Sequence, residues 1–375
     1  MNIQEIRELF PYLNNNIVYF NHASNGPMCK PVIDRIREIL IERSETKIDD
    51  YESFLSVVNE TKNLLANYLN TDKDRIAFTD NTSNGINILA QGLNLESGDK
   101  IILNDIEFPA NVYPFLNLRK KGVEVKFVKA IDGVVTAEDI INAVDDRTKA
   151  ISVSYVQFLS GYKIDLEKLG EFCKNNNIVL AVDSIQGLGA FQLDVQKCNI
   201  DFLSNGTQKW LFGLQGMAFI YVSDKLQKQL EPAFVGWLSV VNAWDLMDYS
   251  FNIKSSASAF QTGTINTLGV YALNTSLKML ESFGYSRIEN IVTDHTLFLR
   301  NKLSEEGLNL FPGQLEEKYF SGIVSFRHPD PEGLFDWLNN RKIIVSLREG
   351  VIRLSPHFYN TTSEIERVID SIKNY

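Results

Sequence analysis

The chain has few of the residues that bind metals or cross-link secreted proteins. It holds three cysteines and four histidines among 375 residues. Cys29, Cys173 and Cys198 form no CxxC pair and no cluster with histidine of the zinc-binding kind, so the sequence indicates no metal site. A sparse, odd set of cysteines is typical of a reducing compartment, and we expect a cytoplasmic protein.

Excess positive charge and long apolar runs are also missing. The sequence has 37 basic and 47 acidic residues, a formal net charge of -10 at pH 7. Nucleic acid and anionic membranes require a positive face, so we expect neither as the main partner. The first segment, MNIQEIRELFPYL, has acidic residues among its apolar ones and predicts neither a signal peptide nor a membrane anchor.

What the sequence does contain is an alternation of short β-rich runs with helical patterns, beginning near residue 75. This alternation predicts an α/β fold with a mainly parallel central sheet covered by helices on both faces. The strand-like runs are 75–79, 100–104, 123–128, 150–156, 178–182, 201–204 and 217–222, and the helical patterns among them are 83–93, 111–121, 137–144 and 165–177.

The length fits two domains better than one. A long helical pattern starts near Leu268, and helices and strands are mixed in the tail that follows. We therefore expect an N-terminal arm over residues 1–18, a large domain over 19–267 and a smaller C-terminal α+β domain over 268–375.

Polar residues follow three of the predicted strands, at the edge where parallel sheets bind ligands. Asp183 ends the apolar run IVLAVD, Lys209 follows the next strand in NGTQKW, and FTDNTSNG leads from a strand into a helix. A lysine amine can hold pyridoxal phosphate, a carboxylate can keep its ring nitrogen protonated, and a helix start can bind its phosphate. Each residue alone has a structural alternative, such as helix capping by Thr82 and Ser83.

Together these segments resemble the class V aminotransferase family, which includes cysteine desulfurases, kynureninase and isopenicillin N epimerase. The resemblance runs from YFNHASNGP near residue 19 to RLSPHFYNT near residue 353. AVDSIQGLGAFQLDV followed by GTQKWLFGLQG is similar to the cofactor signature of the family. The resemblance implies the type I fold of pyridoxal-phosphate transferases, with that cofactor and no metal.

The resemblance also implies the cofactor contacts. Lys209 is expected to hold the cofactor as a Schiff base and to move protons at the substrate Cα. The other expected contacts are Asp183 at the ring nitrogen, Gln186 at the phenolic oxygen, Phe108 stacked on the ring, and Thr82, Ser83 and Gln208 at the phosphate. Phe108, which precedes a proline, has a place in the apolar core as its alternative.

Substrate and subunit contacts follow from the same resemblance. Arg353 is similar to the guanidinium that grips the substrate carboxylate, a task suited to its planar fork; a surface arginine is the alternative. His22 corresponds to a position near the substrate pocket, with a structural role as the alternative. FQTGTINTLG resembles the segment through which a partner subunit reaches the phosphate by way of Thr264, so we expect a homodimer with shared active sites.

The expected reaction is amino transfer from an L-amino acid. A C–S lyase such as a selenocysteine lyase, a kynureninase-like hydrolase or an epimerase is the alternative, because these reactions share the scaffold. A module that binds the cofactor or a nucleotide without chemistry is a third hypothesis, but GLG at 187–189 lacks the third glycine of an NAD fingerprint.

Two departures from relatives, and the lack of a basic cluster, bear on the substrate. The stretch SLREGV at 346–351 has no cysteine, which disfavours a persulfide-forming desulfurase. Phe158 stands where many relatives carry an asparagine, and Gln157 could compensate. No basic cluster marks a pocket for a dicarboxylate, and Arg327 and Arg348 are isolated candidates.

Overall fold

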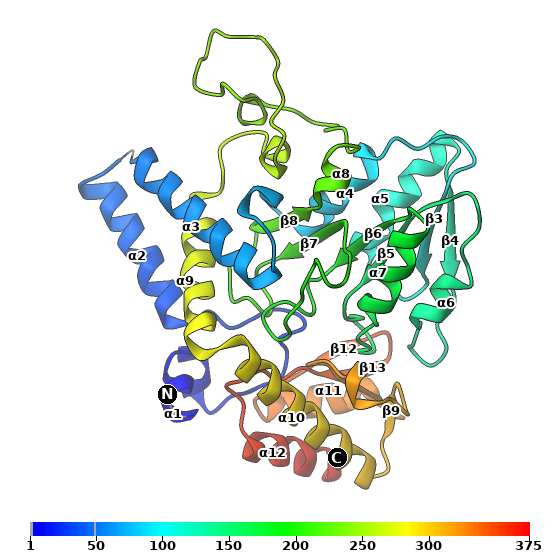
Figure 1. The fold of residues 1–375 in the computed structure, drawn as a ribbon. Helices are drawn as coiled ribbons and strands as arrows, with labels where there is room; N and C mark the ends of the chain where they lie inside the picture. Colours follow the sequence, from blue (N-terminus) through cyan, green and yellow to red (C-terminus); the bar gives the residue numbers. More distant parts are fainter. Residues whose placement is uncertain (1–2, 49) are drawn as a thin grey trace.

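The computed structural model describes residues 3–48 and 50–375 (Figure 1). A seven-stranded sheet lies at its centre, with the strand order β2-β8-β7-β6-β5-β3-β4. The strands are β2 (Ile76–Thr79), β3 (Lys100–Asn104), β4 (Glu124–Val128), β5 (Thr148–Ser154), β6 (Val179–Asp183), β7 (Phe202–Gly206) and β8 (Ala218–Val222). Pairings from β4 through β7 are parallel, and β8 runs antiparallel to β7 and β2, so the predicted mainly parallel α/β sheet is confirmed.

The central strands carry apolar side chains on both faces of the sheet. Helices pack on both faces and bury these side chains in two cores. On β6, Ala181 packs into one core, while Leu180 and Val182 pack into the other. The first core includes residues of α4 (Thr82–Gly92) and α5 (Tyr113–Leu116). The second includes residues of α3 (Tyr51–Leu69), α6 (Ala137–Ile141), α7 (Leu166–Asn175) and α9 (Thr267–Phe283).

A smaller antiparallel sheet, of order β12-β13-β10-β9, lies below the large one in Figure 1. Its strands are β9 (Asn309–Phe311), β10 (Val324–Arg327), β12 (Ser346–Arg348) and β13 (Val351–Leu354). The helices beside it are α10 (Tyr285–Glu305), α11 (Pro331–Asn340) and α12 (Thr362–Lys373). This part of the chain mixes helices with antiparallel strands.

The N-terminal segments contact both parts. After α1 (Ile3–Glu8), β1 (Val18–Tyr19) pairs in parallel with β11 (Ile343–Ile344) of the small part. The helix α2 (Lys30–Glu45) packs beside α9. β1 therefore pairs with the C-terminal part, and α9 packs on α2 and α3. The division of the chain at residues 18 and 267 stays a prediction.

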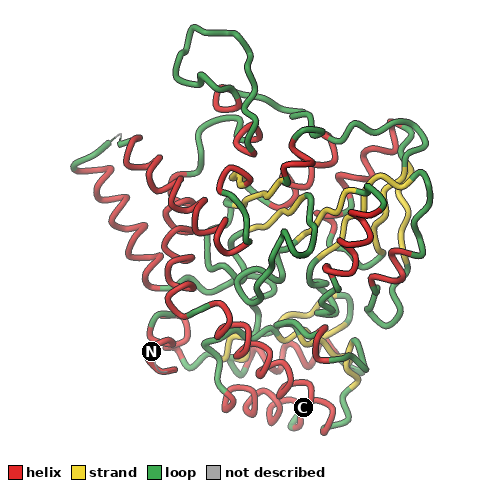
Figure 2. The backbone as a smooth tube through the Cα atoms, viewed as in Figure 1, coloured by secondary structure: helices red, strands yellow, loops and turns green. Residues whose placement is uncertain are grey.

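A segment after α8 (Asp224–Gln227) projects from the top of the molecule and is mostly loop (Figure 2). It spans roughly residues 231–255 and carries many exposed apolar side chains. Among the described helices, none combines the length and apolar character of a membrane span.

Candidate active site

The carboxyl ends of β6 and β7 bring Asp183 and Lys209 together. Asp183 is the last residue of β6 and lies opposite Ser204 of β7, and the chain leaves β7 directly toward Lys209. The Asp183 carboxyl is 2% exposed and Lys209 is half-buried. Each charge shifts the pKa of the other, although no direct ion pair joins them in the part of the chain described. The two opposite charges influence each other without direct contact. This arrangement fits an aromatic ring bound between the Lys209 amine and the Asp183 carboxylate.

Burial is the main influence on both groups. It raises the pKa of Asp183, which the Ile185 N–H, 3.1 Å from Oδ1, partly offsets, while Glu107 raises the pKa further. Burial lowers the pKa of Lys209, although the charge of Asp183 raises it. Lys209 is therefore a neutral amine at a lower pH than an ordinary lysine, and the neutral amine is the form that attacks an aldehyde.

Sequence reasoning missed a second buried carboxylate at this edge, Glu107. It is 7% exposed and accepts hydrogen bonds from Asn104 Nδ2 (2.6 Å), Asn111 Nδ2 (3.0 Å), Gln157 Nε2 (2.8 Å) and the Ser154 backbone N–H (2.9 Å). This set of donors holds the loop after β3 against the end of β5. The only signal in the sequence is the position of Glu107 directly before Phe108.

Phe108 faces the lysine. Its ring is 45% exposed, which contradicts the alternative of a core position. The Lys209 Nζ lies 5.7 Å from the ring centroid. Phe158 meets the Phe108 ring edge-on at 5.3 Å and 79°, so an apolar pair occupies the position where many relatives carry asparagine.

Polar groups and a glycine meet at the start of α4, and we call this place the cradle. Asn81 caps this helix by accepting from Asn84 N, so the alternative in which Thr82 or Ser83 caps it is wrong. Thr82 Oγ1 is buried without a hydrogen-bond partner among the described residues. A Cβ on Gly206 would lie 3.1 Å from that oxygen.

Gln208 completes the cradle, since the same Cβ on Gly206 would lie 2.8 Å from its Oε1. Ser83 follows Thr82 in the first turn and is half-buried. An unpartnered hydroxyl, a glycine backbone and a helix N-terminus meet at this point, and together they fit the phosphate of pyridoxal phosphate.

Gln186 and His22 are buried next to the segment that carries Lys209 and Trp210. Gln186 Nε2 donates to the Ala23 carbonyl, and its Oε1 accepts from Trp210 Nε1, both at 2.9 Å. His22 is fully buried, with Nε2 2.6 Å from the Tyr359 hydroxyl. Burial lowers its pKa well below the usual value, so the ring is neutral. This position favours the structural alternative for His22, and the phenolic-oxygen contact of Gln186 stays a prediction.

Arg353 enters the site from β13 and is buried, with an exposed fraction of 2%, so it is not a surface arginine. Its Nε donates to Ser346 Oγ (3.0 Å), Nη1 to the Phe158 carbonyl (2.6 Å) and Nη2 to Ser24 Oγ (2.9 Å). Burial lowers its pKa to about 9. It makes no ion pair with any carboxylate of residues 3–48 or 50–375, and a buried cation without an anion is costly.

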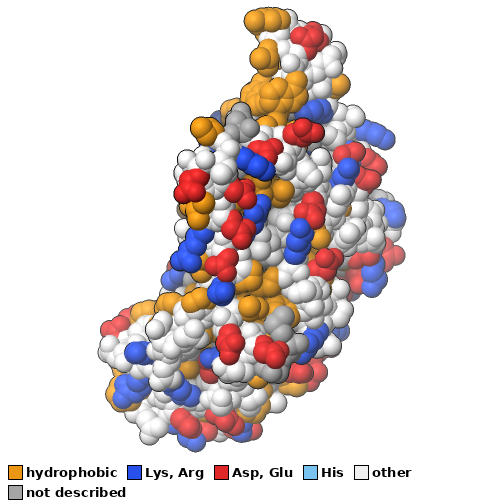
Figure 3. Space-filling view, turned by 90° about the vertical axis from the view of Figure 1, so that its left-hand side faces the viewer, with side chains coloured by type: hydrophobic (Ala, Val, Ile, Leu, Met, Phe, Trp, Pro, Cys, Tyr) orange, Lys and Arg blue, Asp and Glu red, His pale blue; other side chains and the backbone are white. Residues whose placement is uncertain are grey.

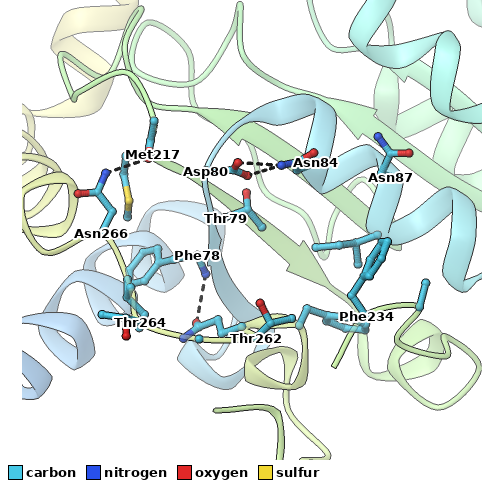
Figure 4. A pocket seen from close by; sticks show the side chains of 17 residues that line it. Phe78, Thr79, Asp80, Asn84, Asn87, Met217, Phe234, Thr262, Thr264 and Asn266 are labelled. Atoms are coloured by element: carbon cyan, nitrogen blue, oxygen red, sulfur yellow. Dashed lines mark hydrogen bonds between the residues drawn. The ribbon is translucent and has the colours of Figure 1, made fainter. Parts of the chain in front are cut away.

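Thr264 lies apart from these residues. It is exposed and lines a surface cavity of about 490 Å³ that includes neither Lys209 nor Asp183 (Figure 4). Asp80 and Asn84 line the same cavity beside the first turn of α4, with Asn84 Nδ2 donating to Asp80 at 2.7 Å. The structure therefore does not place Thr264 at the phosphate cradle of its own chain.

Comparisons with known proteins identify the family of the chain and its fold. The model of the family "Aminotransferase class-V" matches residues 18–368. A "Probable cysteine desulfurase" of Methanothermobacter thermautotrophicus is 29% identical, with 100% of this chain and 98% of the relative covered. The "Uncharacterized aminotransferase YcbU" of Bacillus subtilis is 28% identical, with 98% and 97% covered.

Among solved structures, the apo cysteine desulfurase of Thermococcus onnurineus NA1 superposes with a TM-score of 0.90 at 23% identity. That superposition covers 100% of this chain and 98% of the other. The predicted type I fold of pyridoxal-phosphate transferases is thereby confirmed.

Proposed function

Because the chain belongs to the class V aminotransferase family and its cofactor is pyridoxal phosphate, we propose that it transfers the amino group of an L-amino acid. The observation that carries the proposal is the placement of Lys209 and Asp183 at the ends of adjacent parallel strands, with Arg353 near enough to lower the pKa of Lys209. An amine, a carboxylate and an unpaired guanidinium at one place are what an amino acid and its cofactor require.

Each residue has a separate task in this reaction. When bound, pyridoxal phosphate supplies a sink for the electron pair left at the substrate Cα. The Asp183 carboxylate holds a proton at the ring nitrogen. Lys209 Nζ would remove the proton from the substrate Cα and return it to the carbon on the other side of the amino nitrogen, a 1,3-shift. Arg353 binds the substrate carboxylate through its remaining N–H groups and so fixes which Cα bond faces the amine.

Two further contacts position the cofactor. The Phe108 side chain is partly exposed and faces Lys209. It covers the pyridine ring of the cofactor and keeps water from the Lys209 amine. The Thr82 hydroxyl, Ser83 and Gln208 hold the phosphate at the start of α4. Gln186 contributes its remaining amide hydrogen to the phenolic oxygen.

C–S bond cleavage is the second candidate, since relatives with 29% and 27% identity carry the name "Probable cysteine desulfurase". Persulfide formation needs a reactive thiolate, but Cys29, Cys173 and Cys198 are all buried. Burial raises their pKa values to about 11 for Cys29 and about 12 for the other two, so the thiols stay protonated. Lyase chemistry without a protein thiol is therefore the form of this candidate that the site supports.

The test is to incubate the holoenzyme with single L-amino acids and follow the visible absorbance of the cofactor. Amino transfer predicts loss of the visible band with release of one equivalent of the matching keto acid, and recovery of the band when a keto acid is added. Continuous release of pyruvate, ammonia or sulfide from one substrate would replace amino transfer with the lyase. No spectral response to any amino acid would contradict both.

We also propose a cytoplasmic homodimer. The support is Thr264 in an exposed cavity beside the first turn of α4 (Figure 4), and an apolar segment that projects from the top of the molecule (Figure 3). The segment exposes Phe234, Val241, Trp244, Leu246, Met247, Tyr249 and Phe251. Patches of this kind mark protein interfaces. Light scattering should give twice the mass of 42.6 kDa.

A further inference from the structure

The hairpin that carries Arg353 carries a second arginine on the same face. The strands β12 and β13 are antiparallel, with Ser346 opposite Arg353 and Arg348 opposite Val351. Side chains two positions apart on a strand point to the same face, as do residues directly opposite one another. Arg348 therefore shares the face of Arg353.

One hydroxyl joins the two guanidinium groups. Ser24 Oγ is 2.9 Å from Arg353 Nη2 and 3.4 Å from Arg348 Nη2. Two guanidinium cations thus contact one neutral oxygen. Ser24 is 324 residues away from Arg348 in the sequence. Arg353 is buried, whereas Arg348 is exposed at the rim.

No acidic residue of the described chain pairs with either guanidinium. The other hydrogen bond of Arg348 goes to the Leu347 carbonyl (3.0 Å), and no acidic residue of the described chain pairs with it. Its charge also reaches the site, since it contributes to the lowered pKa of Lys209. Two neighbouring cations repel each other, so an anion between or beside them would relieve that repulsion.

A third arginine on this face shows what a neutralised charge looks like. Arg327 lies opposite Val351 on the other side, on β10, so it shares the face of Arg348. Its Nη1 is 3.1 Å from Asp132 Oδ1 of the large part. Of the two exposed arginines on this face, Arg327 therefore pairs with an acidic residue, whereas Arg348 lies beside the site without a described acidic partner.

We propose that Arg348 binds a second carboxylate of the substrate, so that the enzyme takes L-amino acids with an acidic side chain and the matching dicarboxylic keto acids. This substrate class rests on the proposed amino transfer. Arg353 binds the carboxylate next to Cα, and Arg348, exposed at the rim, binds the one at the end of the side chain. The sequence alone gave no reason to prefer Arg348 over Arg327.

The test uses acids that cannot react, so that binding is measured apart from chemistry. Succinate, glutarate and butyrate are titrated into the holoenzyme by calorimetry. We expect one of the two dicarboxylates to bind about tenfold more tightly than butyrate, the gain of one charge-assisted contact. Arg348→Gln should remove that preference and keep butyrate affinity within about twofold, and Arg348→Lys should retain part of it.

Arg327→Gln is the matched control, because it removes an exposed guanidinium of the same face that is already paired. It should leave the preference unchanged. Equal binding of all three acids by the parent enzyme, or an undiminished preference in Arg348→Gln, overturns the proposal. Failure of amino transfer is recognised separately, as the absence of a spectral response to any amino acid.

Discussion

The two halves of the site differ in how their charges are balanced. At the ends of β6 and β7, Asp183 and Lys209 act on each other, and Glu107 is surrounded by hydrogen-bond donors. In the β12–β13 hairpin, Arg353 and Arg348 have hydroxyls and carbonyls but no described acidic partner. Leaving an ion buried and unpaired costs several kcal/mol. The sheet half is thus complete without substrate, whereas the hairpin half is completed by an anion.

Removing the amine should have the largest effect on this comparison. In Lys209→Ala we expect loss of the covalent link to the cofactor and a fall in turnover of more than about a hundredfold, because the amine that forms the link and moves the proton is removed. Borohydride reduction followed by peptide mass spectrometry measures the link.

Lys62 is the matched control for the lysine. It is buried at 6% exposure and its pKa is lowered to about 7, yet it lies outside the site and donates to Ser258 Oγ. Lys62→Ala should keep the link, and cofactor found on Lys62 in the parent protein would contradict the assignment of Lys209.

Arg353→Lys should weaken binding of the amino acid at the hairpin half and leave cofactor binding at the sheet half unchanged. A lysine cannot form the planar fork, so we expect apparent affinity for the amino acid to fall about 10- to 100-fold, the range for hydrogen bonds to charged groups. Spectral titration gives the amino-acid affinity, and titration of the apo-protein gives the cofactor affinity. If both fall equally, Arg353 acts on the fold instead.

The two halves are also linked through the pKa of Lys209. Burial, with a smaller contribution from the two arginines of the hairpin, lowers this pKa to about 8. The rate at which apo-protein captures the cofactor should therefore rise about tenfold per pH unit below pH 8 and then level off, since only the neutral amine attacks. Arg353→Gln removes one cation, so the midpoint of this pH dependence should move to higher pH. An unchanged midpoint would show that the charge of Arg353 does not influence the pKa of Lys209.

The same contrast explains which residues the sequence could reveal. Asp183 and Lys209 follow adjacent strands, and parallel strands end at one edge, so their proximity follows from the order of elements. The partners of Glu107 come from the loop after β3 and the end of β5, and the pairing of side chains there depends on packing. Arg348 meets Ser24 across 324 residues, which no local pattern encodes.

The smallest effect is expected at the phosphate cradle. Thr82→Val keeps the shape of the side chain and removes only the hydroxyl, so cofactor affinity should fall about 2- to 12-fold, the worth of one neutral hydrogen bond. Because Thr82 Oγ1 has no partner within the described chain, its removal should not lower the melting temperature of the apo-protein, and a buried polar atom without a partner predicts a small rise. Thr79→Val, which alters a half-buried hydroxyl 3.5 Å from the Asn81 carbonyl, should leave cofactor affinity unchanged. A Thr82→Val protein that melts earlier without cofactor and binds it normally would mean that the hydroxyl supports the fold and leaves the phosphate to the helix N-terminus.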